Sequence, residues 1–327
     1  MLLKTGLSRP FVFALGAFCV FVATSSHAQK IKFLLPSISA SPAFAPFMLA
    51  QHQGYYKAEG LEVEFETGKG GADVAKNVGV GNADLGVAIG DSILIFRANG
   101  VPVKSVAVLG GRSLMQLVAR EDRNINSPKD LKDKKVSVMA FQDMSYYALL
   151  ATLASAKVNK NAVQAEAVGP VNVWQLLARG DVDAMVGVPE WGMSAEATGT
   201  KLRWTSTSAY YPGMAQVIIA SDDTIKTRPQ MIQKFVGATL KALKELIDEP
   251  QKAGLAYIEA VPSWKGKEEY VMKTLRYYAT TVYPGQTKPG AMDTVKLGEL
   301  QDFYVMQGLT PKKQPQEELF TNQFITR

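Results

Sequence analysis

Short apolar strands alternate with helices along most of this chain, and this alternation limits the possible folds more than any other feature. The expected strands of the first part cover residues 31–35, 61–65, 84–89 and 103–109. The helices expected between them cover residues 42–53, 72–80 and 92–98. Strands that alternate with helices across short turns predict a mostly parallel sheet with helices on both faces.

The same pattern begins again after residue 126 and predicts a second α/β unit. Its expected strands cover residues 135–140, 163–168 and 184–188, and its expected helices cover residues 127–131, 145–156 and 171–178. The segment Gly81–Val87 also resembles Gly180–Val186, because in each a helix ends on glycine and an aspartate precedes an apolar strand. Two similar α/β lobes would produce this echo.

The last third of the chain is mostly helical. One more strand is expected at 217–220, followed by helices at 229–246, 252–260, 268–281 and 294–306. We expect this tail to pack back on the first lobe, which requires two chain crossings, near residues 110–119 and 204–216. Two crossings make a hinge with a cleft between the lobes. The resulting division is a signal peptide at 1–28, lobe 1 at 29–112 and 213–327, and lobe 2 at 113–212.

The first 28 residues have the pattern of a secretory signal peptide. Lys4 and Arg9 precede an apolar run at 11–23, and small residues at 26 and 28 mark a cleavage site before Gln29. The apolar run would span only about 20 Å as a helix, which is too short to cross a bilayer core of about 30 Å. Cleavage removes two basic residues and no acid, so the net charge falls from +6 to +4.

The mature chain is expected to contain no cysteine, because the only one, Cys19, lies within the apolar run. Disulfides, thiolate catalysis and cysteine-based metal sites are thereby excluded. Only His52 remains as a histidine, and neither G-x-S-x-G nor H-E-x-x-H occurs. We therefore expect no metal, no cofactor and no enzyme activity, with a carboxylate mechanism through Asp143 and Glu190 as the open alternative. No basic run supports nucleic-acid binding.

Five stretches follow one another in an order that resembles one family. They are Ala50–Glu64, Gly81–Gly86, Asn99–Lys104, Ser127–Val136 and Leu177–Ala184. Together they resemble the periplasmic solute-binding proteins of nitrate, sulfonate, taurine and thiamine-pyrimidine-precursor ABC importers, over roughly residues 30–240. The resemblance implies a two-lobed type II periplasmic binding protein fold, a periplasmic location, and permease and ATPase partners in the inner membrane. We expect the chain to be a monomer that closes on its solute.

One subgroup with this fold consists of enzymes, the yeast pyrimidine-precursor synthases. The pattern of this subgroup is a site with a cysteine cluster, histidines and a lysine-bound cofactor. At the matching loop this chain has Gly68–Ala72, which contains no cysteine. This departure supports the expectation that the chain is not an enzyme.

The ligand-binding residues expected from lobe 1 follow from one rule, that ligands lie beyond the carboxyl ends of the strands in open α/β sheets. The rule selects Ser41, Phe44, Gly70, Gly71, Ala72 and Asp91. The stretch Gly70–Ala72 opens a helix, so its N–H groups suit an oxyanion, although a plain glycine turn explains it equally well. Asp91 is alternatively a helix N-cap. Arg112 lies at the hinge, where its planar fork suits a ligand carboxylate or sulfonate, or a salt bridge between lobes.

Lobe 2 and the second crossing supply the remaining candidates. They are Asp143, Ser145, Tyr146, Glu190, Trp191 and Tyr211. Asp143 or Ser145 is expected to cap a helix, while Tyr146 faces the cleft. The three aromatic side chains are expected in loops, where they suit stacking on a flat ligand.

The charges of these candidates leave two solutes open. Arg112 and the mild positive net charge favour an organic anion such as a sulfonate or carboxylate, which is the first expectation. Asp143 and Glu190 favour an aminopyrimidine, whose amino group and ring nitrogens a carboxylate can hold. In the first case Glu190 faces away from the solute or pairs with a lysine. In the second case Glu190 carries the recognition.

The signal pattern predicts that the mature chain begins at Gln29. We expect N-terminal sequencing of the protein from a periplasmic extract to read Gln29-Lys30-Ile31. A membrane fraction that retains residues 1–28 would contradict this prediction.

Overall fold

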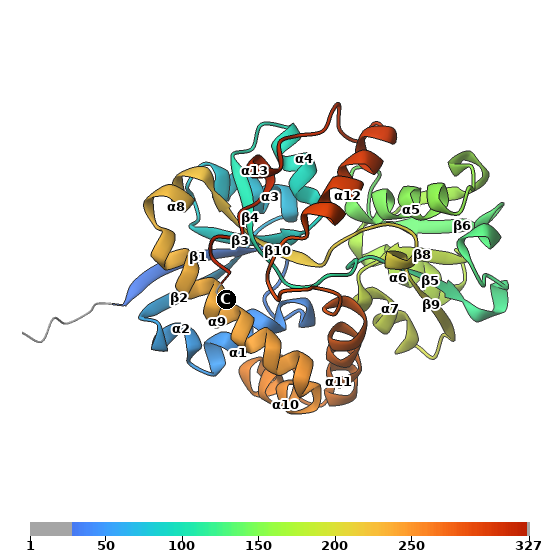
Figure 1. Ribbon diagram of the computed structural model, residues 1–327. Helices are drawn as coiled ribbons and strands as arrows, with labels where there is room; N and C mark the ends of the chain where they lie inside the picture. The colour runs from blue at the N-terminus through green and yellow to red at the C-terminus, as the bar shows by residue number, and fades with distance from the viewer. Residues whose placement is uncertain (1–27, 326–327) are drawn as a thin grey trace, which may run out of the picture.

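The computed structural model describes residues 28–325, which form two α/β lobes (Figure 1). The signal-peptide prediction falls on residues that lie outside this range. The first lobe contains a five-stranded sheet in the order β2-β1-β3-β10-β4, in which only β10 runs antiparallel to its neighbours. Its strands are β1 (Gln29–Leu35), β2 (Leu61–Thr67), β3 (Leu85–Ile89), β4 (Val103–Val108) and β10 (Gln216–Ser221).

The second lobe repeats this plan with the order β7-β6-β8-β5-β9, and β5 is its antiparallel strand. Its strands are β5 (Gln116–Arg120), β6 (Lys135–Val138), β7 (Gln164–Ala167), β8 (Ala184–Gly187) and β9 (Leu202–Ser206). In both lobes, the antiparallel strand is the one that follows a crossing from the other lobe. The predicted α/β class with two sheets is therefore confirmed.

Helices cover the sheets of both lobes. Those that follow strands of lobe 1 are α1 (Ala45–His52), α2 (Tyr55–Ala58), α3 (Gly71–Gly79), α4 (Ser92–Ala98), α8 (Asp222–Thr227), α9 (Pro229–Asp248) and α10 (Pro250–Ala260). Lobe 2 contains α5 (Met144–Ser155), α6 (Gly169–Arg179) and α7 (Pro189–Glu196). The tail ends with α11 (Glu268–Tyr277), a π-helical turn (Tyr278–Val282), α12 (Thr294–Met306) and α13 (Gln316–Leu319).

The core of lobe 1 is aromatic. The ring of Phe33 in β1 stacks on Phe235 of α9 at 4.9 Å between centroids, and Tyr56 stacks on the same Phe235 at 4.8 Å. Phe47 of α1 completes this group, with its ring 4.8 Å from Phe33 and 6.4 Å from Phe235. All four side chains are almost fully buried, so together they contribute several kcal/mol of hydrophobic stabilisation, at about 25 cal/mol per Å² buried. This packing fixes the loops at the carboxyl end of β1.

The two crossings are shorter than the sequence suggests. We expected crossings near residues 110–119 and 204–216, but β5 and β9 occupy the ends of those ranges and pair with each other. The crossings are therefore confined to residues 109–115 and 207–215. The pairing of β5 with β9 joins segments about eighty residues apart, so a local pattern could not reveal it.

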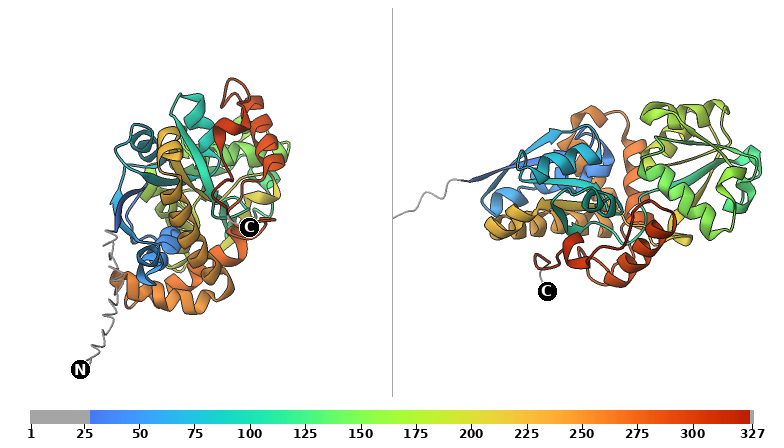
Figure 2. Two further views of the ribbon diagram at one scale, coloured as in Figure 1. Left: turned by 60° about the vertical axis from the view of Figure 1, so that its left-hand side comes forward. Right: turned by 90° about the horizontal axis from the view of Figure 1, so that it is seen from above.

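The C-terminal helices contact both lobes. Figure 2 shows the lobes side by side, with the orange and red tail segments lying between them. Lys273 of α11 pairs with Glu196 of α7 at 2.5 Å, and Tyr304 of α12 packs edge-on against Tyr147 of α5. The assignment of residues 213–327 to lobe 1 stays a prediction. The contacts of α11 and α12 with lobe 2 were not expected from the sequence.

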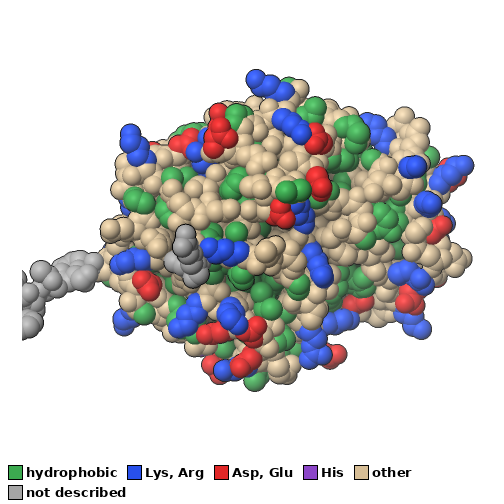
Figure 3. Space-filling view, viewed as in Figure 1, with side chains coloured by type: hydrophobic (Ala, Val, Ile, Leu, Met, Phe, Trp, Pro, Cys, Tyr) green, Lys and Arg blue, Asp and Glu red, His purple; other side chains and the backbone are tan. Residues whose placement is uncertain are grey.

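Charged side chains are dispersed over the surface. On the face that Figure 3 draws, lysine and arginine lie among aspartate and glutamate, and neither sign covers a whole lobe. Within residues 28–325, no helix combines the length and the apolar character that crossing a membrane requires.

A matched pair of glycine substitutions tests the packing that places α3 on the sheet. A Cβ atom at Gly86 of β3 would lie 2.4 Å from Cγ1 of Val74, whereas one at Gly237 of α9 would meet no atom within 4 Å. We expect Gly86→Ala to lower the free energy of unfolding by about 1–3 kcal/mol because the site is already full. Gly237→Ala should raise it by about 0.5–1 kcal/mol through helix propensity. Urea denaturation measures both, and equal effects would contradict this packing.

Candidate functional site

A cavity of about 570 Å³ lies between the two lobes. Lobe 1 forms most of its wall, through the residues that follow β2 and β3, and lobe 2 supplies the loop after β6. The lining residues are Pro36, Lys69, Gly70, Gly71, Ala72, Lys76, Ala88, Ile89, Ser92, Ile95, Phe96, Asn99, Val101, Met139, Ala140, Gln142, Asp143 and Met144. The wall is mainly apolar, with polar groups at a few positions, which is the usual character of a small-molecule site. Four of the predicted site residues, Gly70, Gly71, Ala72 and Asp143, lie in it.

Gly70 makes the turn by which the chain enters α3. Its φ of +93° is strained for any residue with a Cβ atom, and its N–H donates to the Pro36 carbonyl at 2.9 Å. This bond ties the loop after β2 to the loop after β1. At Gly71 a Cβ would lie 3.8 Å from the Phe96 ring of α4, an ordinary van der Waals contact, so packing at this position does not require glycine.

The lobe 2 side of the cavity is built on an N-cap. The Asp143 carboxylate accepts from the Ser145 N–H at 2.8 Å and from its hydroxyl at 2.6 Å, and the Ser145 hydroxyl accepts from Met139 N–H at 2.9 Å. Asp143 is therefore the cap of α5, one of the two expected roles, and buried Ser145 stabilises the loop.

An aromatic pair lies beside this loop. Phe141 stands in the chain between two lining residues and is 46% exposed, and its ring meets Tyr146 edge-on at 5.0 Å. Tyr146 lies in the first turn of α5 rather than in a loop, so that part of the expectation is wrong. Phe141 was not among the predicted site residues, and its sequence position, two residues before the Asp143 cap, was the available signal.

Glu190 lies where the two lobes meet. It begins α7 in lobe 2, yet its carboxylate accepts from the Ser41 hydroxyl of lobe 1 at 3.2 Å and from the Tyr278 hydroxyl at 2.9 Å. The side chain is 8% exposed, and burial raises the pKa of its carboxyl group. No lysine or arginine within the described residues forms an ion pair with it.

The tail surrounds Glu190 with aromatic side chains. They are Tyr278 and Tyr270, which bond to it, Tyr257 and Tyr283, whose hydroxyls lie near its charge, and Trp264, which stacks on Tyr270. The Tyr270 hydroxyl donates to the Glu190 backbone carbonyl at 3.2 Å, while Tyr257 and Trp264 both donate to the carbonyl of Ala40. The hydroxyl of buried Tyr283 has no hydrogen-bond partner among the described residues. No signal in the sequence marked them, since Tyr257, Tyr270 and Tyr278 lie within expected helices, where aromatic side chains are equally typical of a core, and Trp264 and Tyr283 lie outside those helices.

Asp91 and Tyr211 join the crossings rather than the cavity. The Asp91 carboxylate accepts from Met214 N–H at 2.8 Å, and Tyr211 shares a hydrogen bond of 2.9 Å with Ser113. Asp91 takes the N-cap position of α4 but forms no capping bond with its side chain. Both side chains are buried at the point where the two crossings meet lobe 1.

The last three predicted residues contact structural neighbours. Arg112 is exposed and donates to the Thr280 carbonyl at 3.4 Å, so it holds the tail rather than an acidic residue of the opposite lobe. Phe44 is buried beneath the loop after β1. Trp191 lies in α7, not in a loop, and its ring covers Gly187 of β8. The proline at position 189, a common first helical residue, was the overlooked signal.

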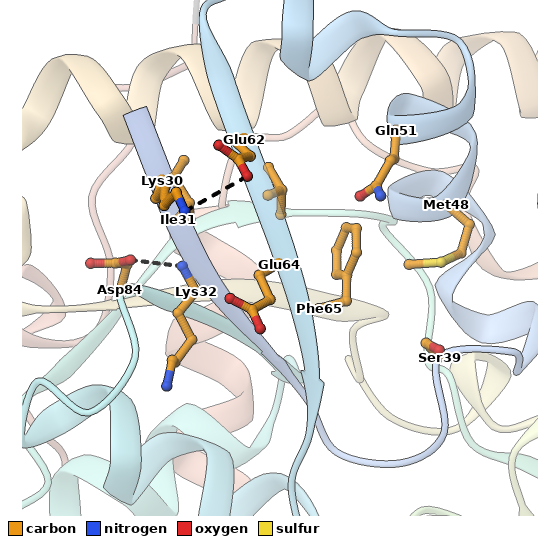
Figure 4. Close-up of a pocket in the computed structure, with 11 residues that line it drawn as sticks. Lys30, Ile31, Lys32, Ser39, Met48, Gln51, Glu62, Glu64, Phe65 and Asp84 are labelled. Atoms are coloured by element: carbon orange, nitrogen blue, oxygen red, sulfur yellow. Dashed lines mark hydrogen bonds and ion pairs between the residues drawn. The ribbon is translucent and has the colours of Figure 1, made fainter. Parts of the chain in front are cut away.

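A second hollow, of about 670 Å³, lies at the outer edge of the lobe 1 sheet (Figure 4). Its charged side chains are partly engaged already, since Lys30 pairs with Glu62 at 4.0 Å and the Lys32 N–H donates to Asp84 at 2.8 Å. All of its lining residues come from lobe 1. Lobe movement would therefore not enclose a ligand there, and the cavity between the lobes is the better candidate site.

A family model described as NMT1/THI5 like matches residues 41–253. The riboflavin-binding protein RibY of Chloroflexus aurantiacus is 24% identical over 291 residues, which make up 86% of this chain and 82% of that protein. A 4-amino-5-hydroxymethyl-2-methylpyrimidine phosphate synthase of Aspergillus parasiticus is 26% identical over 260 residues, or 72% of this chain and 71% of that enzyme.

Among solved structures, the periplasmic aliphatic sulphonate-binding protein SsuA of Escherichia coli superimposes with a TM-score of 0.73 at 16% identity. The match covers 91% of this chain and 99% of SsuA. At this level of identity the similarity establishes the fold. The predicted two-lobed periplasmic binding protein fold is thereby confirmed.

The prediction that the chain is not an enzyme is contradicted by these relatives. Several fungal relatives of about 25% identity are named as pyrimidine phosphate synthases, and they cover 70% or more of this chain. The lack of cysteine and the single histidine of the expected mature chain exclude particular chemistries, but they do not exclude enzyme activity as such.

The buried carboxyl group of Asp91 predicts a pH dependence of stability. Burial raises its pKa to about 7, against the lowering effects of the Met214 amide, Lys296 and Tyr211. The folded state therefore binds this proton more tightly than the unfolded state, and its stabilising effect is lost as the pH rises from about 4 to about 7. We expect Asp91→Asn, which does not titrate, to gain stability relative to the wild type over that range. Chemical denaturation at several pH values measures this, and parallel profiles would contradict the assignment.

Proposed function

Because this chain belongs to the NMT1/THI5-like family, we propose that it captures a flat nitrogen heterocycle that carries an amino group, between its two lobes. The single observation that supports this choice is the environment of Glu190, a buried carboxyl group at the meeting point of the lobes. The proposed role is that of the solute-binding subunit of an ABC importer, which delivers the solute to a permease.

Glu190 suits an aminopyrimidine-like edge in either protonation state. An ionised carboxylate accepts from the amino group and from a protonated ring nitrogen. A neutral carboxyl group, which burial favours, donates its proton to a ring nitrogen while its other oxygen accepts from the amino group. Each oxygen has two acceptor sites, and the described bonds from Ser41 and Tyr278 use one on each.

The surroundings of Glu190 supply further features that suit such a solute. The neighbouring tyrosines and Trp264 offer aromatic faces, which interact favourably with flat rings and with cationic groups. The orphaned Tyr283 hydroxyl is a polar group for which a ligand would provide a partner. Glu190 is not among the residues that line the cavity of about 570 Å³, so the proposal requires the solute to reach from that cavity to Glu190.

The names of several relatives agree with this chemistry. They are named for synthesis of an aminopyrimidine phosphate, whereas another relative is named for riboflavin, a flat heterocycle whose pyrimidinedione ring carries no amino group. SsuA, by contrast, is named for sulphonates, and it shares the fold at lower identity.

An organic anion, our first expectation from sequence, has less support. It required Arg112 at the solute and Glu190 turned away or paired with a lysine. Instead, Arg112 bonds to the tail and Glu190 is buried without a cationic partner in residues 28–325. Where Glu190 is ionised it would repel an anion, and such a contact between like charges costs several kcal/mol at an interface.

We further propose that the chain acts in the periplasm. The signal pattern at residues 1–28 provides for export, and SsuA, which has the same fold, is described as periplasmic. The proposed partners are the permease and ATPase subunits of the importer.

The proposal predicts opposite effects for two substitutions. With 4-amino-5-hydroxymethyl-2-methylpyrimidine and riboflavin as probes, we expect Glu190→Gln to weaken binding of at least one by about 30-fold or more, which corresponds to about 2 kcal/mol or more. Arg112→Ala, the matched control, should change its Kd less than threefold. Isothermal titration calorimetry measures both, with an alkanesulfonate as the comparison probe.

Two outcomes would overturn the proposal. One is tight binding of the alkanesulfonate that Arg112→Ala abolishes, and the other is heterocycle binding that Glu190→Gln leaves unchanged. Mass spectrometry of the same mixtures after incubation reports any conversion of the bound heterocycle, so a catalytic role would be detected in the same experiment.

A further inference from the structure

We propose that a third cavity is a binding site for a small oxyanion, either a carboxylate or a phosphate. It lies behind the hinge that the two crossings form. This cavity has a volume of about 370 Å³ and lies away from the cavity between the lobes. Its lining residues are Val108, Gly110, Gly111, Met214, Gly285, Gln286, Thr287, Lys288, Ala291, Met292, Asp293, Thr294, Lys296 and Asn322. The first crossing, the second crossing and the tail thus all contribute to its wall.

Two lysine side chains in this wall have no carboxylate within ion-pair distance among residues 28–325. The Lys296 ammonium donates to the Gly111 carbonyl, and Lys288 donates to the Ile325 carbonyl at 3.2 Å. Both side chains are half-buried. A partly buried ammonium held only by a carbonyl retains unused donors and an unneutralised charge, so an anion placed between these groups would be stabilised.

The acidic groups near Lys296 are Asp91, Asp293 and Glu299, and none of them forms an ion pair with it. Asp293 directs its carboxylate into the start of α12, where it accepts from Val295 N–H at 3.0 Å and Lys296 N–H at 3.1 Å. Asp91 attracts Lys296 but lies beyond ion-pair distance, and its own carboxylate accepts from Met214 N–H.

The remaining groups around the cavity also favour an anion. Arg112, whose stem lies 3.5 Å from the position of a Cβ at Gly285, adds a third positive charge near Lys296. Thr287 and Thr294 line the wall with hydroxyl groups that can donate. Burial lowers the pKa of Lys296, which is the expected effect on a cation that lacks a counterion. An anion would restore charge balance and would join both crossings to the tail.

The test uses inorganic phosphate and citrate as probes on the full mature chain, at constant ionic strength set with sodium chloride. We expect saturable binding of at least one probe by isothermal titration calorimetry, and a Kd at least tenfold higher in Lys296→Gln. The matched control is Lys234→Gln, because Lys234 also donates to a backbone carbonyl, that of Glu59 at 3.0 Å, but lies on α9. Its Kd should equal that of the wild type.

Three outcomes would overturn the inference. They are the absence of saturable binding up to tens of millimolar probe, an unchanged Kd in Lys296→Gln, and a loss of binding in Lys69→Gln instead. The last would place the anion in the cavity between the lobes. If Lys296→Gln does not fold, Lys288→Gln provides the same comparison. Binding of phosphate but not citrate, or the reverse, identifies which oxyanion class the site accepts.

Discussion

The close contact of the two crossings with the tail is the constraint on which the rest of the structure depends. Gly110 and Gly111 make this contact possible, since a Cβ on Gly110 would lie 2.6 Å from the Tyr283 backbone and one on Gly111 2.4 Å from the Gly285 backbone. The Gly110 carbonyl accepts from Ala215 N–H of the second crossing, and Gly111 N–H donates to the Tyr283 carbonyl. Any movement of the lobes must therefore pivot about this junction.

A buried carboxyl group between two lobes is costly unless polar partners surround it. Glu190 obtains hydroxyl donors from lobe 1 and from the tail, so it is satisfied only when lobe 2 lies against both. The bond from Ser41 would break if the lobes separated, whereas those around the Glu190 backbone lie within lobe 2 and the tail. A solute favours the closed arrangement only if it contacts lobe 1 or the tail together with this carboxyl group, because a ligand shifts a conformational equilibrium only by its differential affinity.

Most of the fold was predictable from the sequence, since buried strands and amphipathic helices are local patterns. The strands β5 and β9 were missed because they are stabilised by pairing with each other across about eighty residues. Of the site, the loop after β2 was predictable from strand-end geometry and a glycine turn, and Glu190 from its position after β8. The tail tyrosines at helical spacing were not predictable as site residues, because that spacing is equally typical of residues in a core. Only the tertiary packing brings Tyr278 to Glu190.

One helix links the two cavities. Lys296 in the first turn of α12 lines the cavity behind the hinge, while Tyr304 near its other end donates to the sulfur of Met144, which lines the cavity between the lobes. A helix of thirteen residues is about 20 Å long and nearly rigid over that length. A shift of its first turn would therefore displace Tyr304 and the wall that it contacts. The hinge cavity and the solute cavity thus share a structural element, and a group bound at Lys296 would affect the solute cavity to the extent that it moves this helix.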